Sequence, residues 1–520
     1  MNFRARPPAR RREGVRHGAL RAVFMAGLVV AAGAADACQQ VPERPGVLIV
    51  VVDSLRADHL HHAGDPRPLS PTLDRVAAEG TRFTEARTSA PWTTPSVMTL
   101  FTGLAPTTHH VDNNDRQLDR SVQTLAERFH QAGYRTAAVM PALTLADHFG
   151  FARGFDRFTL EVKGHGGVSG NWTVDEAIRF LADGDRPFFL YAHFWDVHYN
   201  YTPPVPYALR FAAGRRAGAG ETDDVTAMLG GIDSRQQRVP LAAERVAWLE
   251  GQYAGEILFT DTQIGRLLAH LARSGLDRDT IVVVMADHGE GFQEHGFLGH
   301  TVAAYDELER VPLLVRWPGR IAAGRELTQT VGLIDMAPTL LDLAGVPYAP
   351  EEFEGRSRAA ALLGGADHPP VGADEEILVA TSRRGRVRGL VSSRMAYLFD
   401  FATRRAELYD LDADPAQQHD LAGERPEEAE RWRRKLCERL ARVPGSGEIP
   451  AVALPPQIRQ TLDAGLGKLG YLGAEDAESS ARRQRDVERE DAPAERRRYL
   501  AEMDCPGAVE IAPRSVPPAR

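Results

Sequence analysis

The chain has 520 residues, which suggests roughly three units at about 150 residues per domain. An apolar fraction of 43% and a charged fraction of 26% are typical of a globular protein and argue against a wholly disordered, collagenous or membrane-embedded chain. The 62 Lys and Arg against 71 Asp and Glu leave a net charge of −9, which argues against binding to nucleic acid. Three cysteines, Cys38, Cys437 and Cys505, are too few for a disulfide scaffold, so we expect packing to hold the core.

The N-terminus has the pattern of an export signal over residues 1–37. Arginines between positions 4 and 21 precede an apolar stretch at 22–35 that is too short to anchor the chain stably across a bilayer. Residues 35–37 form a cleavage pattern and Cys38 follows it, so lipid attachment is an alternative to simple secretion, and an uncleaved signal anchor is a third. We expect an exported protein (periplasmic, secreted or an outer-membrane lipoprotein) that meets a membrane only through this N-terminal segment.

The body of the chain alternates strands with helices. Residues 46–52 and 280–285 are continuous apolar runs, as in strands buried on both faces, and 134–140 and 187–192 are further strand candidates. Helices are expected over residues 71–80, 95–102, 121–133, 175–181 and 244–273, and an insertion or loop over 211–238. This alternation predicts an α/β fold, an α/β/α sandwich with a largely parallel central sheet.

Polar residues follow three of these strands, at the point where each strand ends. They are Asp53 after the first, His193, Asp196 and His198 after the strand at 187–192, and Asp287 and His288 after the strand at 280–285. Because ligands bind beyond the carboxyl ends of strands in open α/β sheets, these side chains should meet at one edge. A divalent cation would neutralise the two carboxylates and accepts both Asp oxygen and His nitrogen. The sequence therefore predicts a metal site, although each residue alone is more often a turn or cap residue.

The segment Pro91–Ser96 supplies a candidate nucleophile. Thr93 lies just before a helix opened by Pro95, where free N–H groups suit an anionic ester. Coordination to a metal lowers the pKa of a hydroxyl and makes its attack feasible. The simpler alternative is that Thr93 or Thr94 is an N-cap.

These residues belong to a longer series of motifs that occur in order along the chain. The series includes Val50–Asp58, Ser70–Asp74, Ala90–Ser96, Asp287–Glu290, Asp335–Leu341 and Glu407–Leu411. Together they resemble the sulfatase family of the alkaline phosphatase superfamily, as a variant with a Thr nucleophile. The resemblance implies an alkaline phosphatase-like catalytic domain over 45–350 and a small C-terminal α+β subdomain over 351–445. The extension over 446–520 is rich in charged residues, so we expect a largely solvated or disordered tail in which Cys505 is an incidental thiol.

The resemblance also implies roles for individual residues. Asp53, Asp287 and His288 match metal-ligand positions, and Thr93 lies at the nucleophile position, where its oxygen completes the ligand set. The other residues implied at the site are His198 and His300, which contact the anionic group or the leaving oxygen, Asn114 and Arg56 at the substrate, and Glu290 and His295 as supporting residues.

Two departures from the family pattern bear on the chemistry. Thr93 and Val97 stand where sulfatases carry a modified Cys or Ser and an Arg, and oxidation of a Thr gives a ketone instead of the aldehyde of formylglycine. Ser54 replaces a second acidic residue common in calcium-dependent sulfatases. The ligand set therefore favours one Mn or Zn ion, with Ca as the alternative. A second metal, held by Asp196 with His198 and His300, is a further alternative.

The expected function is that of a metal-dependent hydrolase. It would cleave a sulfate, phosphate or phosphonate ester on a glycan, a lipid head group or a small aryl or alkyl group, through a metal-activated Thr93. Two alternatives remain open: a non-catalytic member of the family that binds sulfated or phosphorylated glycans, and a phosphoryl-group transferase.

Overall fold

The computed structural model describes residues 44–161, 169–184, 187–211, 241–301, 303–364, 375–381, 387–442, 449–468 and 492–505. The predicted export signal lies outside the described residues, as does the insertion expected at 211–238 except for its first residue. In the part of the chain that is described, no helix has both the length and the apolar character needed to cross a membrane.

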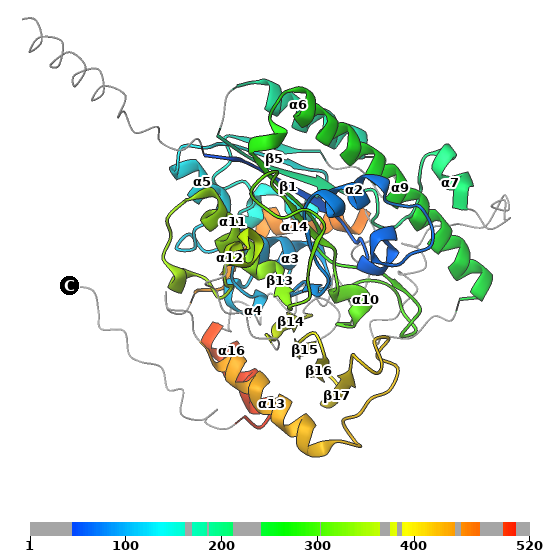
Figure 1. Cartoon of the computed structure of the whole chain (residues 1–520). Coiled ribbons are helices and arrows are strands. Elements are labelled where there is room, and N and C mark those ends of the chain that lie inside the picture. The colour runs from blue at the N-terminus through cyan, green and yellow to red at the C-terminus, as the bar shows by residue number, and fades with distance from the viewer. Residues whose placement is uncertain are drawn as a thin grey trace, which may run out of the picture. The chain divides into compact units, whose positions relative to one another are not determined.

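An eight-stranded sheet lies at the centre of the larger part of the molecule, in the order β12-β2-β11-β8-β1-β7-β5-β6 (Figure 1). Strand β1 (Gly46–Val52) lies between β7 (Phe188–Phe194) and β8 (Thr280–Ala286), parallel to both. All three strands are buried along their whole length, which explains their continuous apolar runs. Within this sheet only β11 runs antiparallel to its neighbours. The other strands are β2 (Thr81–Phe83), β5 (Arg135–Met140), β6 (Arg157–Leu160), β11 (Leu313–Arg316) and β12 (Arg325–Leu327).

Helices cover both faces of this sheet, as the alternating pattern predicts (Figure 1). On one face, α2 (Pro71–Glu79) and α6 (Gly170–Ala182) both pack against α9 (Ala243–Arg273). On the other face, α3 (Thr93–Thr102) packs against both α5 (Leu125–Gln131) and α11 (Met336–Ala344). Helix α5 begins later than the expected residue 121, because Thr124 forms a capping box with Glu127. The predicted α/β/α sandwich is confirmed.

Shorter elements connect these layers. They are η1 (Ala57–His59), η2 (His61–Ala63), β3 (Ala86–Arg87), α4 (Pro106–His109), β4 (Arg116–Gln117), η3 (Leu143–Leu145), η4 (Asp147–Phe149), α7 (Val205–Phe211), η5 (Asp277–Asp279), β9 (Gly291–Phe292), β10 (Leu298–Gly299), α10 (Asp306–Glu309), β13 (Val331–Gly332), η6 (Leu333–Asp335), η7 (Pro350–Glu352) and α12 (Ala359–Leu363).

A second, smaller sheet confirms the expected C-terminal α+β subdomain. Its four antiparallel strands are β14 (Ile377–Ala380), β15 (Val387–Val391), β16 (Met395–Asp400) and β17 (Arg405–Asp410). Helix α13 (Pro426–Ala441) packs on this sheet and contacts α16 (Ala492–Glu502). The subdomain has its own apolar cluster, which includes Leu390, Leu408 and Leu436.

The C-terminal extension departs in two places from the solvated tail that its composition predicts. Residues 449–468 pack onto the main domain, because β18 (Val452–Ala453) pairs with β4, and α14 (Pro456–Lys468) follows with Leu462 in the main core. Helix α16 then places Tyr499 and Leu500 in the core of the C-terminal subdomain. The prediction that Cys505 is an incidental thiol is wrong, since it forms a disulfide with Cys437 of α13. The apolar residues of α16 are too sparse to show a helical stripe, so only packing against α13 reveals them.

Candidate active site

Three neighbouring strands bring the predicted polar residues to one edge of the sheet. His193, near the end of β7, lies opposite Val51 of β1, and Val52 lies opposite Ala286 at the end of β8. Asp53 follows β1 directly and Asp287 follows β8, so both leave the sheet at the same level. Because these strands are parallel and in this register, residues that are far apart in the sequence meet at one edge of the sheet.

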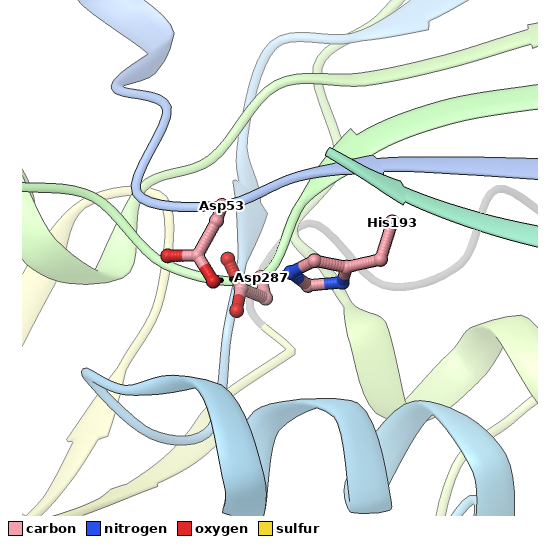
Figure 2. A group of neighbouring side chains, drawn as sticks. All are labelled: Asp53, His193 and Asp287. Carbon is pink, nitrogen blue, oxygen red and sulfur yellow. Dashed lines mark hydrogen bonds and ion pairs between the residues drawn. The ribbon is translucent and has the colours of Figure 1, made fainter. Parts of the chain in front are cut away.

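Asp53, His193 and Asp287 form a buried group whose ligand atoms all lie within 4.8 Å of one another. Figure 2 shows the two carboxylates and the imidazole pointing toward one another. The Nε2 of His193 lies 3.0 Å from Asp53 Oδ2, and its Nδ1 lies 2.9 Å from the hydroxyl of Tyr191, which orients the ring. Asp287 Oδ2 is buried with no hydrogen-bond partner. Two Asp oxygens and an imidazole, with one oxygen unsatisfied, fit a divalent transition-metal ion.

The environment makes the two carboxylates unequal. Burial raises the pKa of Asp53, but the hydrogen bond from His193 and the nearby His198 and His288 outweigh it, so the net shift is downward. Burial and the charge of Asp53 together raise the pKa of Asp287. Two adjacent carboxylates therefore cannot both hold a charge easily without a cation between them.

Thr93 is the first residue of α3 and lies directly beside this group. Its Oγ1 donates a hydrogen bond to Asp53 Oδ2 at 3.3 Å and lies 3.4 Å from Nε2 of His288. The N-cap of α3 is Trp92, and the hydroxyl of Thr94 donates to the carbonyl of Thr144. The alternative in which Thr93 or Thr94 serves as the N-cap is therefore wrong, and the Thr93 hydroxyl is directed at the ligand cluster.

His288 adds a second imidazole to the cluster. Its Nδ1 lies 2.9 Å from the carbonyl of Gly289, and its Nε2 lies 3.6 Å from both Asp53 Oδ1 and Asp287 Oδ2. The four residues implied as ligands by the family resemblance are thus brought together. His193 is missing from that implied set, although its place at the end of a strand was a signal for it.

His198 and His300 form an aromatic wall next to His288. The centroid of the His300 ring lies 4.4 Å from that of His288 and 4.9 Å from that of His198. Nδ1 of His300 lies 3.0 Å from Glu290 Oε1, while the His198 ring stacks on Trp195 at 4.0 Å. These contacts orient both imidazoles.

Arg56 and Asn114 differ in how closely they approach the site. The Arg56 guanidinium forms hydrogen bonds with Asp58, with Glu294 and with the carbonyl of Glu290, so it braces the loop that follows β8. Asn114 is 6% exposed and its Oδ1 has no hydrogen-bond partner. Neither side chain has a hydrogen bond to Thr93 within the described part of the chain, so their roles at the substrate stay predictions.

Two other predicted site residues lie elsewhere. The Asp196 carboxylate accepts hydrogen bonds from the N–H (2.7 Å) and hydroxyl (2.9 Å) of Ser169, the residue before α6. These hydrogen bonds hold the carboxylate at the start of that helix. His295 lies between Glu307, at 2.6 Å, and the carbonyl of Gln417, at 3.1 Å, and so links the loop after β8 to the C-terminal subdomain. The candidate ligand group found in the described residues includes neither Asp196 nor His295.

Comparison with known proteins assigns the family. The sulfatase family model matches residues 45–346. The chain belongs to the sulfatase family. It is 26% identical over 430 residues to a delta 4,5-hexuronate-2-O-sulfatase of Bacteroides thetaiotaomicron, an alignment that covers 74% of this chain and 86% of that protein. It is 27% identical over 383 residues to an arylsulfatase of Clostridium perfringens, covering 60% of this chain and 77% of that protein.

Solved structures agree with the fold of this sulfatase-family enzyme. The phosphonate monoester hydrolase of Agrobacterium radiobacter superposes with a TM-score of 0.64 at 23% identity, covering 76% of this chain and 95% of that chain. At this identity the likeness concerns the fold alone, which is that of the alkaline phosphatase-like sulfatases. The family and the named sulfatases among its relatives support a sulfuric ester hydrolase.

Proposed function

We propose that this protein hydrolyses a sulfate, phosphate or phosphonate ester with Thr93 as its nucleophile. The observation that supports this most directly is the position of the Thr93 hydroxyl, which is 3.3 Å from Asp53 Oδ2 and 3.4 Å from His288 Nε2. The formylglycine route has no basis here, because Thr carries a methyl group on its β-carbon. Val97, which stands at the position of the usual arginine partner, is 1% exposed and apolar.

Asp53, His193, Asp287 and His288 are the residues that would hold one divalent metal ion. A mixed oxygen and nitrogen ligand set favours Mn or Zn over Ca. When bound there, the ion would lower the pKa of the Thr93 hydroxyl and neutralise charge on the ester. The second-metal alternative has no support from the placement of Asp196, whose carboxylate binds Ser169.

The protein's own groups then carry out the transfer. The Thr93 oxygen attacks sulfur or phosphorus while its hydroxyl proton passes to Asp53 Oδ2, the acceptor of its hydrogen bond. The bond to the leaving oxygen breaks, and a Thr ester forms. His300, fixed through Nδ1 by Glu290, donates a proton to the leaving alcohol through Nε2, with His198 as the alternative donor. Water then gives a proton back to His300 and attacks sulfur or phosphorus. The bond to the Thr93 oxygen breaks, this oxygen regains its proton from Asp53, and the sulfate, phosphate or phosphonate product leaves. The first-turn N–H groups of α3 favour the anionic substrate next to Thr93.

The substrate we propose is an anionic ester on a sugar. This rests on the relative from Bacteroides thetaiotaomicron, whose name specifies a 2-O-sulfated hexuronate. We also propose that the protein is exported. The basic and apolar N-terminal pattern supports this, and so does the Cys437–Cys505 disulfide, because disulfides persist in oxidising compartments.

The test is turnover by the protein without residues 1–37, loaded with Mn or Zn. Aryl sulfate, a phosphate monoester, a phosphodiester and a phosphonate monoester are compared with wild type, Thr93→Ser and Thr93→Ala. We expect activity on at least one ester that Thr93→Ser retains in part and Thr93→Ala reduces by about a thousandfold or more. Equal rates in wild type and Thr93→Ala would remove Thr93 as the nucleophile. Silence on every ester, and on sulfated sugars, would favour the non-catalytic binding alternative.

A further inference from the structure

A pocket lies where the main domain meets the C-terminal subdomain, and none of its lining residues belongs to the group around Thr93. It encloses about 480 Å³, including its open mouth. Thr108 at the end of α4 and Glu354 line one side, and residues of β15, α13 and α16 line the other. The ten-residue helix α3, about 15 Å long, separates Thr93 at its start from α4.

Arg388 is the most informative residue of this pocket. It is 1% exposed, and no Asp or Glu of the described residues forms an ion pair with it. Its Nη1 donates to the carbonyl of Thr381 at 2.5 Å, its Nη2 donates to the hydroxyl of Tyr499 at 3.0 Å, and its Nε has no partner. A buried guanidinium without an anion is costly, so an anion in the pocket would complete the charge balance.

The other charges of the pocket have the same sign. Arg439, Arg442 and Arg496 line it together with Arg388, against the two carboxylates of Asp112 and Glu354. Both carboxylates are already engaged by the protein. Glu354 pairs with Arg439 at 3.1 Å and accepts the N–H of Ala105 at 2.7 Å, and Asp112 lies 3.6 Å from Arg116. Among the residues that line this open pocket, Arg388 and Arg442 therefore have no carboxylate partner within the described part of the chain.

We propose that this pocket binds a tetrahedral oxyanion, sulfate or phosphate, either as the free ion or as a substituent of a small sugar. Guanidinium groups match the oxygen spacing of such anions with paired N–H donors. Thr108 and Tyr499 line the same walls, and the Tyr499 hydroxyl accepts a hydrogen bond from Arg388 Nη2. The site is separate from the proposed active site, and its test requires no turnover.

The experiment is equilibrium dialysis of the full chain against radiolabelled sulfate and phosphate at constant ionic strength. Thr93→Ala/His198→Ala alters the proposed active site, and Arg442→Gln/Arg496→Gln alters the pocket at positions on its open side. Arg431→Gln/Arg434→Gln is the matched control, because it removes the same two positive charges from exposed positions of α13 outside the pocket. Arg388→Gln is a second pocket variant, and circular dichroism checks that each variant is folded.

We expect wild type, Thr93→Ala/His198→Ala and Arg431→Gln/Arg434→Gln to bind the anion at the pocket with equal affinity. Arg442→Gln/Arg496→Gln should bind roughly tenfold more weakly or worse, because two charged donors are lost. Competition by glucosamine 6-sulfate then separates the two sources of the anion: stronger competition than by unlabelled sulfate indicates a sugar substituent, and weaker competition indicates the free ion. The proposal is overturned if wild type binds neither anion, if binding disappears in Thr93→Ala/His198→Ala, or if the pocket variants bind as tightly as Arg431→Gln/Arg434→Gln.

Discussion

The disulfide between Cys437 and Cys505 should determine whether α16 stays docked on α13. The bond closes a loop with a sequence separation of 68 residues. In the chain-entropy treatment, a loop of that length corresponds to about 4 kcal/mol of stabilisation relative to the uncrosslinked chain. Both cysteines are buried in the same apolar cluster, at 4% and 7% exposure, so replacement by Ala leaves the packing largely in place and removes mainly the cross-link.

The assay is hydrogen exchange by mass spectrometry on Cys437→Ala/Cys505→Ala, read from peptides of α13 and α16. A loss of about 4 kcal/mol corresponds to about a thousandfold lower protection where opening of the subdomain limits exchange. Wild type treated with a reductant should behave as the double variant does, and Cys38→Ala should behave as wild type. Protection within about threefold of wild type in the double variant would refute the reasoning, since the cross-link would then contribute less than about 1 kcal/mol.

Three further predictions concern the site and the loop beside it. His193→Ala should weaken Mn or Zn binding by at least about tenfold in competition with a chromogenic chelator, and unchanged affinity would exclude it as a ligand. Glu290→Gln should lower kcat about tenfold with little change in KM, because His300 loses the carboxylate that orients it; an effect on KM alone would contradict this role. Burial opposes protonation of His295, but its contact with Glu307 outweighs burial and raises its pKa in the folded state above the usual value of 6.5. Its contribution to stability is therefore complete below about pH 6.5 and is lost as the pH rises through the raised pKa. Urea unfolding should show that His295→Gln lowers the free energy of unfolding at about pH 5.5 and leaves it nearly unchanged at about pH 9. An equal loss at both pH values would argue against the pair, and so would a loss of the same size when His295→Gln is made in a Glu307→Gln background.

Strand and helix placement followed from local patterns that need no tertiary information. The buried strands β1 and β8 are continuous apolar runs in the sequence. In a chain that alternates strands with helices, a short run of this kind indicates a strand buried on both faces. The arrival of Asp53 and Asp287 at one edge also followed, because the polarity of parallel strands is fixed once the α/β pattern is recognised. The sequence predicted that Thr93 lies just before a helix. It did not predict that Thr93 is the first residue of that helix, or where its hydroxyl points.

Other features depended on contacts between residues far apart in the chain. Whether His193 belongs with the ligands depends on the register between β1 and β7, which places its Nε2 3.0 Å from Asp53 Oδ2. Asp196 follows the same strand, but Ser169 holds its carboxylate. Strand-end position alone could not separate the two residues, because side chains beyond a strand point in directions set by the next segment that packs on them.

The C-terminal region shows most clearly the difference between what the local sequence predicts and what distant contacts decide. The sequence by itself determined that this region is charged and has few apolar residues, and from composition we expected a solvated tail. Only the tertiary structure decided that Tyr499 and Leu500 are buried against α13, and that Cys505 reaches Cys437. A short helix with a few apolar residues has no stable fold of its own, and its burial depends on a surface that a segment about 60 residues earlier supplies.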